Sequence, residues 1–216
     1  GFAEYDLDRA WLEIETLFEG QWDTGMVPHI LFRQVDRSYY PGPEVWGGRG
    51  PIPSSGISQP PIAATFIRCL WAQDRAAGEA RVRTLLPRLL DWHRWFFDWR
   101  GEGGAICVTH PWESGRDNAP DWDAPLAAVE PEDVGDYRRS DARFVAADEL
   151  PHDAEFDRYL RLVALGRACG WDEARLKAES PFRVADPAMT FTLLRANRDL
   201  LAMCRDLGAP TGEIED

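Results

Sequence analysis

Residues 79–99 read EARVRTLLPRLLDWHRWFFDW. Apolar side chains recur here at helical spacing and cover most of the helix circumference: Val82, Leu85, Leu86, Leu89, Leu90, Trp92, Trp95, Phe96 and Phe97. A helix that is apolar around most of its surface must be buried on several sides, so this stretch predicts a fold in which helices pack on helices. Pro87 is expected to kink this helix or to mark its true start.

The flanking sequence predicts more helices and no convincing run of alternating strands. Residues 6–19 form an amphipathic pattern, with Asp6 or Asp8 as the N-cap and Gly20 at the end. Another helix is expected to open after Pro60-Pro61. The remaining helical patterns cover residues 154–168, 172–178 and 187–207, with Gly170 and Gly208 at C-cap positions. This pattern favours an all-α layered or toroidal domain over an α/β fold.

Composition narrows the classes of partner. The 216 residues suffice for one large domain or for part of a larger one. The formal net charge is -13, so a phosphate backbone or an anionic membrane surface would be repelled. The only basic cluster, Arg138, Arg139 and Arg143, is interrupted by Asp136 and Asp141. We therefore expect neither a nucleic acid nor a membrane as partner.

Cysteine and histidine spacing disfavours a metal site. Cys69, Cys107, Cys169 and Cys204 form no C-x-x-C pair, and the four histidines form no H-x-x-x-H pair. Buried free thiols in a reducing compartment are expected instead. No apolar run reaches membrane-spanning length and the first residues lack a secretory signal, so the predicted location is cytoplasmic, with no cofactor.

Residues 20–58 contain seven glycines and five prolines and are too irregular for a packed helix. A loop of this length inside a compact domain is usually functional or disordered. Its aromatic residues, Trp22, Tyr39, Tyr40 and Trp46, favour a lid or a binding wall.

Residues 110–123 read HPWESGRDNAPDWD and contain four carboxylates and two tryptophans. Gly115 and two prolines forbid a continuous helix, so we expect a loop. An acid beside flat apolar rings suits a site that cleaves sugars, because the rings cover the C–H faces of a pyranose and the carboxyl group protonates the leaving oxygen. The stretch therefore predicts a glycosidase site.

Asp117 is the best candidate for the general acid, because it lies between small residues and near Trp112 and Trp122. Burial beside apolar groups would keep its proton near neutral pH. Two alternatives stay open: an acidic solvated turn, and a calcium loop formed by Asp117, Asn118, Asp121 and Asp123. For Glu113 we prefer a hydrogen-bonding role that shapes the turn.

The ten tryptophans fall into two groups. Four lie on predicted loops and are candidates for stacking on a ligand: Trp22, Trp46, Trp112 and Trp122. Six lie on predicted helices and are expected in the core: Trp11, Trp71, Trp92, Trp95, Trp99 and Trp171.

Three stretches resemble, in order, the motifs of glycoside hydrolase family 63: residues 20–30 (GQWDTGMVPHI), 55–61 (SGISQPP) and 112–120 (WESGRDNAP). The similarity is greatest to the bacterial glucosylglycerate and mannosylglycerate hydrolases of that family, and it continues from residues 156–160 (FDRYL) to the final helix. The resemblance implies an (α/α)6 barrel, present here as one partial domain, residues 1–216, of about the middle half. It also implies inverting hydrolysis of small α-glucosides or α-mannosides without a metal.

The resemblance also assigns residues. Asp117 matches the general acid. Trp112, Gly115 and Gln59 match positions that line the sugar pocket. Residues 36–46 match a mobile lid. The aromatic substrate contacts that we expect from the longer 20–58 loop are Trp22, Tyr40 and Trp46. The general base, a Glu, is expected in the carboxyl-terminal half of the barrel beyond Asp216, and the first inner helix upstream of Gly1.

One departure concerns specificity. In the glycerate-specific enzymes an Arg and a Tyr hold the glycerate carboxylate, and Leu150 and Phe156 stand at those positions here. Neutral side chains cannot replace charge-assisted hydrogen bonds. Either an arginine of the 138–143 cluster, with Arg139 as our candidate, binds the carboxylate, or the substrate carries none there.

The expected partner is thus a small carbohydrate. A non-catalytic carbohydrate-binding or scaffold protein with the same helical fold is the alternative from a different class. An α-glucosidase-like or trehalase-like enzyme acting on a neutral substrate is another. A homo-oligomer, or a second polypeptide that completes the barrel, is also compatible with the sequence.

Overall fold

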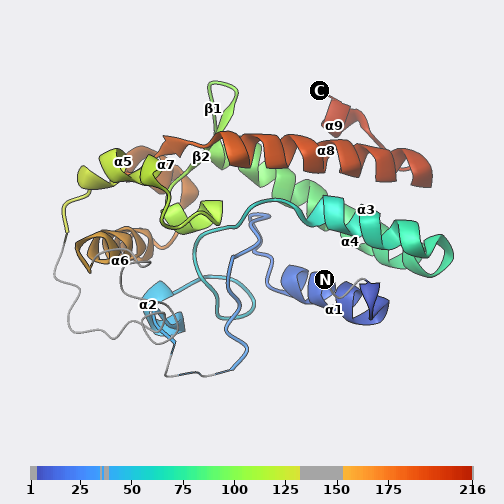
Figure 1. Ribbon diagram of the computed structural model, residues 1–216, viewed down its shortest axis with the longest axis horizontal. Coiled ribbons are helices and arrows are strands. Elements are labelled where there is room, and N and C mark those ends of the chain that lie inside the picture. The colour runs from blue at the N-terminus through green and yellow to red at the C-terminus, as the bar shows by residue number, and fades with distance from the viewer. Residues whose placement is uncertain (1–3, 35, 37–38, 132–152, 216) are drawn as a thin grey trace. The chain divides into compact units, whose positions relative to one another are not determined.

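The computed structural model describes residues 4–34, 36, 39–131 and 153–215 and is mostly helical (Figure 1). The chain divides into two compact units. Unit 1 comprises Gly1–Val27, Pro60–Ile106 and Pro187–Asp216, and unit 2 comprises Pro28–Gln59 and Cys107–Asp186.

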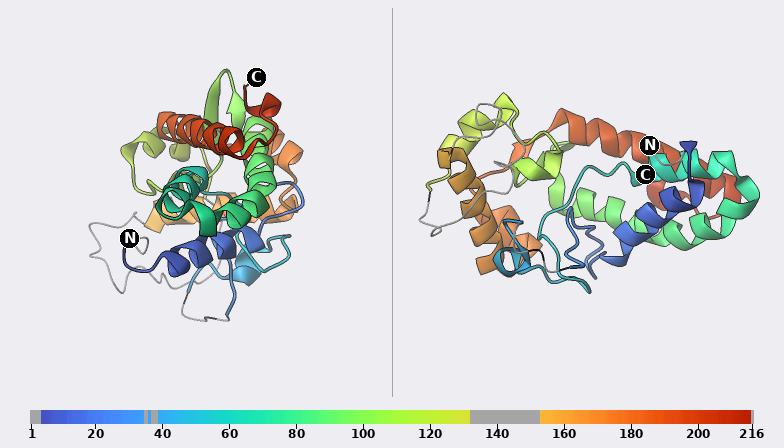
Figure 2. Two further views of the ribbon diagram at one scale, coloured as in Figure 1. Left: turned by 90° about the vertical axis from the view of Figure 1, so that its right-hand side faces the viewer. Right: turned by 60° about the horizontal axis from the view of Figure 1, so that its bottom comes forward.

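Unit 1 is a helical bundle. Its longer helices are α1 (Leu7–Glu19), α3 (Ala63–Gln73), α4 (Arg75–Trp95) and α8 (Pro187–Leu207), and its short ones are the π-helix η2 (Phe96–Arg100), which continues α4, and α9 (Gly212–Glu215). Helix α3 packs against α4 and α8, and α1 packs against α3 and α4; the end-on view in Figure 2 shows α3, α4 and α8 side by side. The predicted burial is confirmed for α4, where Val82, Leu89 and Trp92 have no exposed surface. It is wrong for Phe97, which is 56% exposed on η2, and Trp99, expected in the core, is partly exposed.

The boundaries of α1 follow the predicted caps, whereas the start of α4 does not. The Asp6 carboxylate accepts a hydrogen bond from the Arg9 backbone N–H (2.8 Å), and Gly20 ends α1. Helix α4 begins four residues earlier than predicted, because the Asp74 carboxylate caps it by accepting from the Ala77 N–H (2.9 Å). Pro87 therefore lies inside α4, and the idea that it marks the start of the helix is wrong.

A buried carboxylate links α8 to α3. The side chain of Asp199 on α8 is 2% exposed and accepts hydrogen bonds from Arg195 (2.7 Å), Thr65 (2.8 Å) and Arg68 (2.5 Å). Burial by itself would raise the pKa of Asp199, but the bonds from Arg195, Arg68 and Thr65 outweigh it, and the pKa is lowered. The carboxylate is thus ionised and fully paired, and it stabilises the contact between the two helices.

Unit 2 has shorter elements. They are α2 (Pro43–Trp46), the 3-10 helices η3 (Pro111–Ser114) and η4 (Pro120–Trp122), α5 (Asp123–Ala127), α6 (Asp153–Ala168) and α7 (Glu173–Glu179). Helix α2 packs against α6. The described residues between 20 and 58 are irregular apart from α2 and one isolated antiparallel bridge between Leu31 and Ser54, as predicted.

A small antiparallel sheet was not predicted. Strand β2 (Ala105–Val108) pairs with β1 (Gly101–Glu102), where Gly101 faces Ile106, and with β3 (Val184–Ala185), where Cys107 faces Ala185. Strands of two to four residues are too short to show an alternating pattern, so sequence periodicity does not reveal them.

Trp171 fills a narrow slot in unit 2. It was expected on a helix, but it follows the end of α6 with a left-handed φ of 55°, while its burial in the core is confirmed (2% exposed). Its indole N–H donates to the Trp46 carbonyl (2.8 Å). A Cβ at Gly56 or Gly166 would lie closer than 3.0 Å to the indole, so both glycines are needed to make room for the ring.

Candidate functional site

The 110–123 loop has a tightly fixed backbone. Its first turn, η3, is capped by His110, whose ring nitrogen Nδ1 accepts from the Trp112 N–H (3.1 Å). Gly115 ends the turn with a left-handed φ of 67°, a conformation that favours glycine. Asp117 follows two residues later, so this turn helps to fix where the main chain of Asp117 lies.

Glu113 holds the loop from inside. It is 1% exposed, and its carboxylate accepts hydrogen bonds from the Thr109 N–H (2.7 Å), the Thr109 hydroxyl (3.1 Å) and the Ser58 N–H (3.4 Å). The preferred interpretation, a carboxylate that shapes the turn, is confirmed. These bonds also fasten residues 55–61 to the 110–123 loop, so two of the three resembling stretches are joined in unit 2.

Trp112 is the centre of an aromatic cluster. Its ring lies roughly parallel to that of His29 (6.4 Å between centroids, 24°) and also contacts His110 (4.5 Å) and Trp46 (5.8 Å). Phe156 (5.9 Å) and Tyr159 (5.5 Å), both on α6, pack edge-on against it. Trp112 itself remains partly exposed, so the cluster presents an indole surface supported from behind.

The two histidines of the cluster are neutral. Burial lowers the pKa of His110 to about 4, and burial together with the neighbouring His110 lowers the pKa of His29 to about 3. The tautomer of His110 follows from its bonds: because Nδ1 accepts from Trp112, Nε2 carries the proton and donates to the Tyr159 carbonyl (3.1 Å). His29 Nδ1 lies 2.7 Å from the Ser55 hydroxyl.

Asp117 is presented at the solvent-accessible side of this loop. Partial burial of its carboxyl raises its pKa, opposed by a hydrogen bond from its own backbone. Its main-chain carbonyl accepts a short hydrogen bond from the Tyr159 hydroxyl (2.6 Å). A raised pKa is the property that a general acid requires near neutral pH.

The neighbouring Arg116 anchors the loop on its other side. Its guanidinium pairs with the buried Asp186 (3.3 Å) and with Asp121 (3.1 Å), and it lies over the Trp122 ring. Its carbonyl accepts from the Trp122 indole N–H (2.8 Å). The main chain is therefore held on both sides of the Asp117 side chain.

The other predicted site residues have varied positions. Gln59 and Trp46 belong to unit 2, and each has a buried side-chain nitrogen, Nε2 and Nε1 respectively, without a hydrogen-bond partner among the described residues. Tyr40 is partly buried. Its pKa is raised, mainly by burial and to a smaller extent by the nearby Glu44 carboxylate. Trp22 is buried in unit 1 (3% exposed). Arg139 lies outside the described residues.

Of three further predictions, two can be compared with the structure. Trp122, a stacking candidate, is only 2% exposed and packs against Phe182 in the core. The Leu150 position and the 138–143 arginine cluster lie outside the described residues. The cysteines form no disulfide, but the expectation that all are buried is wrong, because Cys69 is exposed on α3.

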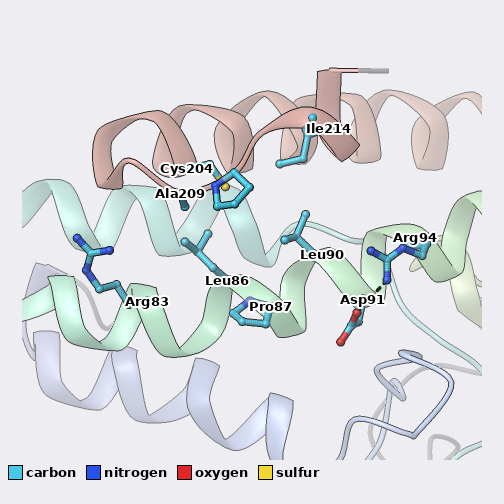
Figure 3. A pocket seen from close by; sticks show the side chains of 11 residues that line it. Arg83, Leu86, Pro87, Leu90, Asp91, Arg94, Cys204, Ala209 and Ile214 are labelled. Atoms are coloured by element: carbon cyan, nitrogen blue, oxygen red, sulfur yellow. Dashed lines mark hydrogen bonds and ion pairs between the residues drawn. The ribbon is translucent and has the colours of Figure 1, made fainter.

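Within the described part of the chain, no three His, Cys, Asp or Glu side chains come together as a metal site. In the same residues, no helix combines the length and apolar character needed to cross a membrane. An apolar groove of about 630 Å³ lies in unit 1 between α4 and the segment leading to α9 (Figure 3), lined by Leu86, Leu90 and Ile214 among others. None of the predicted site residues lines this groove.

Sequence reasoning missed His29, His110, Tyr159 and Arg116. One signal was present: Tyr159 follows Phe156 by three residues, so both lie on the same face of α6. A buried tyrosine on a core-facing position usually needs a partner for its hydroxyl. The partner, the Asp117 carbonyl, is 42 residues away in sequence and could not be inferred without the fold.

The known proteins that the chain resembles are hydrolases of mannosylglycerate or glucosylglycerate. Mannosylglycerate hydrolase MGH2 of Selaginella moellendorffii is 47% identical over 220 residues, which cover 100% of this chain and 45% of that protein. Glucosylglycerate hydrolase of Mycolicibacterium hassiacum is 33% identical over 234 residues, covering 100% of this chain and 52% of that protein. The crystal structure of a family 63 mannosylglycerate hydrolase from Thermus thermophilus, in complex with Tris and D-glycerate, matches with a TM-score of 0.94 and 42% identity, covering 99% of this chain and 52% of that one.

The fold and the sequence relatives place the chain in the class of helical glycoside hydrolase domains. More specifically, it belongs to the mannosylglycerate hydrolase MGH1-like glycoside hydrolase domain family, whose model matches residues 1–216. The chain spans about half the length of the curated relatives it matches. The expected all-α, barrel-type fold is confirmed.

Proposed function

We propose that the protein containing this chain hydrolyses a small α-mannoside or α-glucoside, with mannosylglycerate or glucosylglycerate as the leading substrates. The relatives supply the substrate class, since they are hydrolases of these two compounds by name. The observation that carries the proposal for this chain is the carboxyl of Asp117, whose pKa is raised, on the same fixed loop as the partly exposed indole of Trp112.

Asp117 is assigned as the general acid. It donates its proton to the glycosidic oxygen as the bond to the anomeric carbon breaks, while water attacks the opposite face of the sugar. Inversion requires a second carboxylate about 6.5–9.5 Å away to deprotonate that water. The family resemblance assigns this role to a Glu in the part of the barrel that the chain does not span.

Trp112, Gly115 and Gln59 are assigned to the sugar pocket. Trp112 offers a flat apolar surface for the C–H face of the pyranose. Gln59 has a buried amide N–H group without a partner among the described residues, and a sugar hydroxyl could accept from it. Trp46 supports the Trp112 ring, Tyr40 belongs to the proposed lid, and Trp22 and Arg139 remain assignments from sequence alone.

The test is Asp117→Asn in the full-length protein. We expect kcat for mannosylglycerate or glucosylglycerate to fall by about 10²–10⁴-fold, the usual contribution of a general acid. The Kd of the unreacted substrate should change little, because the amide keeps the shape of the carboxyl. Asp123→Asn removes an exposed carboxylate from the same loop and is the matched control. Full activity of Asp117→Asn would remove Asp117 from the role.

The stereochemistry is tested separately. Proton NMR of the first turnovers should show the β-anomer of the released sugar, because a single displacement inverts the α-configuration. The appearance of the α-anomer first would refute the inverting mechanism.

A neutral substrate is the second candidate, favoured by Phe156. This side chain is 5% exposed and packs its ring on Trp112, so it brings no hydrogen-bonding group to the position where a carboxylate-binding tyrosine was expected. Comparing kcat/KM for mannosylglycerate, glucosylglycerate and trehalose decides between the candidates. A preference for trehalose would favour the neutral substrate.

A further inference from the structure

Tyr159 connects α6 to the loop that carries Asp117. Its hydroxyl donates to the Asp117 carbonyl (2.6 Å), and its own main-chain carbonyl accepts from His110 Nε2–H (3.1 Å). The tyrosine side chain is 3% exposed and its ring contacts both Trp112 and His110 (5.5 Å to each). One residue of α6 is therefore bonded to both ends of the segment from His110 to Asp117.

The direction of these bonds is fixed. His110 can donate only from Nε2, because its Nδ1 already accepts from the Trp112 N–H (3.1 Å). Burial keeps the ring neutral, with its pKa lowered to about 4, so this arrangement does not change between about pH 5.5 and 8. The phenol must donate to Asp117, because a carbonyl oxygen can only accept.

We infer that Tyr159 is a positioning residue for the general acid: its hydroxyl holds the Asp117 main chain in place, so that the carboxyl is directed at the glycosidic oxygen. This inference rests on the proposed function of Asp117. The Asp117 side chain has only two rotatable bonds, so its direction depends mainly on where its Cα lies. On the amino-terminal side, that position is held by the Arg116 ion pairs with Asp186 and Asp121.

Loss of this bond should affect proton donation more than sugar binding. A displacement of about 1 Å at a catalytic group can lower the rate by up to about 100-fold, whereas the binding of the sugar ring depends on other contacts. The Tyr159 ring is held by aromatic contacts with Trp112, His110 and Phe156. The Tyr159→Phe variant should therefore keep its ring in place and lose only the hydrogen bond.

The experiment compares two substrates in the full-length protein. Mannosylglycerate or glucosylglycerate needs a proton on its leaving oxygen. The corresponding α-glycosyl fluoride needs little acid assistance, because fluoride is a good leaving group. For Tyr159→Phe we expect kcat on the glycerate substrate to fall by about 10–100-fold with KM little changed. Its kcat on the fluoride should stay within about twofold, since the step that requires the acid is bypassed.

Two variants are controls. Asp117→Asn should show the same dependence on the leaving group, more strongly, and adding Tyr159→Phe to it should cause little further loss, because both act on the same step. Ser180→Ala removes another hydroxyl-to-carbonyl bond in unit 2, from Ser180 to Phe182 (2.9 Å), and should leave both activities unchanged.

An equal loss on both substrates for Tyr159→Phe would overturn the inference and show a structural role, as would unchanged activity on both. If Tyr159→Phe does not fold, His110→Gln serves instead. This variant alters the hydrogen bond to the Tyr159 carbonyl and keeps the phenol. An equal loss on both substrates would again overturn the inference. Full activity of Asp117→Asn would refute the proposed function itself, which is a different outcome from failure of Tyr159→Phe alone.

Discussion

Replacing Gly56 by alanine places a methyl group inside the indole of Trp171. The added Cβ would lie 2.5 Å from Cε3 of the ring and closer still to Cδ2 and Cε2, whereas ordinary contacts begin at 3.4 Å. On the α6 side the ring lies against the Gly166 backbone, so closely that a Cβ there would be 2.6 Å from Cε3, and this leaves the ring little room to move away. Gly56 does not have a positive φ, so the effect of the substitution is steric.

The cost can be worked out from these contacts. Forcing extra volume into a packed core typically costs about 1–3 kcal/mol. If the indole moves, its hydrogen bond to the Trp46 carbonyl (2.8 Å) is lost as well, which adds about 0.5–1.5 kcal/mol. We therefore expect Gly56→Ala to lower the free energy of unfolding by about 2–4 kcal/mol.

Denaturant unfolding of the full-length protein, followed by tryptophan fluorescence and circular dichroism, measures this change. Gly212→Ala is the control, because a Cβ there meets no atom within 4 Å. In a Trp171→Leu background the clash is gone, so Gly56→Ala should cost much less than in the wild type. A loss below about 0.5 kcal/mol for Gly56→Ala alone, the range of ordinary surface substitutions, would refute this reasoning.

Three further predictions concern stability. Asp199→Ala should lower the free energy of unfolding by about 1–3 kcal/mol in denaturant titrations, because it removes charge-assisted hydrogen bonds from Thr65, Arg68 and Arg195 to a buried carboxylate. Asp206→Ala, which breaks an exposed pair with Arg75, should cost at most about 1 kcal/mol, and equal costs would contradict this expectation. Burial lowers the pKa of His93 to about 4, below its ordinary value of 6.5, so the unfolded chain takes up the proton first as the pH falls. The free energy of unfolding should therefore decline between pH 6.5 and pH 4, by up to about 1.4 kcal/mol per pH unit for this residue. His93→Gln should reduce that slope in denaturant titrations at several pH values, and an unchanged slope would contradict this prediction. Glu113→Gln should cost about 1–3 kcal/mol, because an amide cannot accept every bond from Thr109 and Ser58, and unchanged unfolding in denaturant would show that this carboxylate does not hold the turn.

Long amphipathic helices were predictable from sequence because their signals are local. The Asp6 cap, the apolar face of residues 6–19 and Gly20 are contiguous, and α1 follows them within one residue. The sheet was not predictable, since β1 and β3 have two residues each and their pairing through β2 depends on chain segments about 80 residues apart.

The site was predictable only in part, for the same reason. The chemistry of Asp117 and Trp112 could be inferred from residue types within one loop. The groups that hold them could not, because Tyr159 acts through a main-chain carbonyl and Asp186 pairs with Arg116 over 70 positions. Trp46 was expected on a loop, as a residue that stacks on a ligand. The structure instead buries it completely, on the short helix α2.

The two units are interleaved along the chain, and this ordering has a consequence for biosynthesis. Unit 1 includes α8, which begins at Pro187, and the last segment of unit 2 ends at Asp186. A growing chain therefore cannot complete either unit until most of the 216 residues have left the ribosome. Such dependence on distant segments slows folding, and no single cut in the polypeptide releases one unit intact from the other.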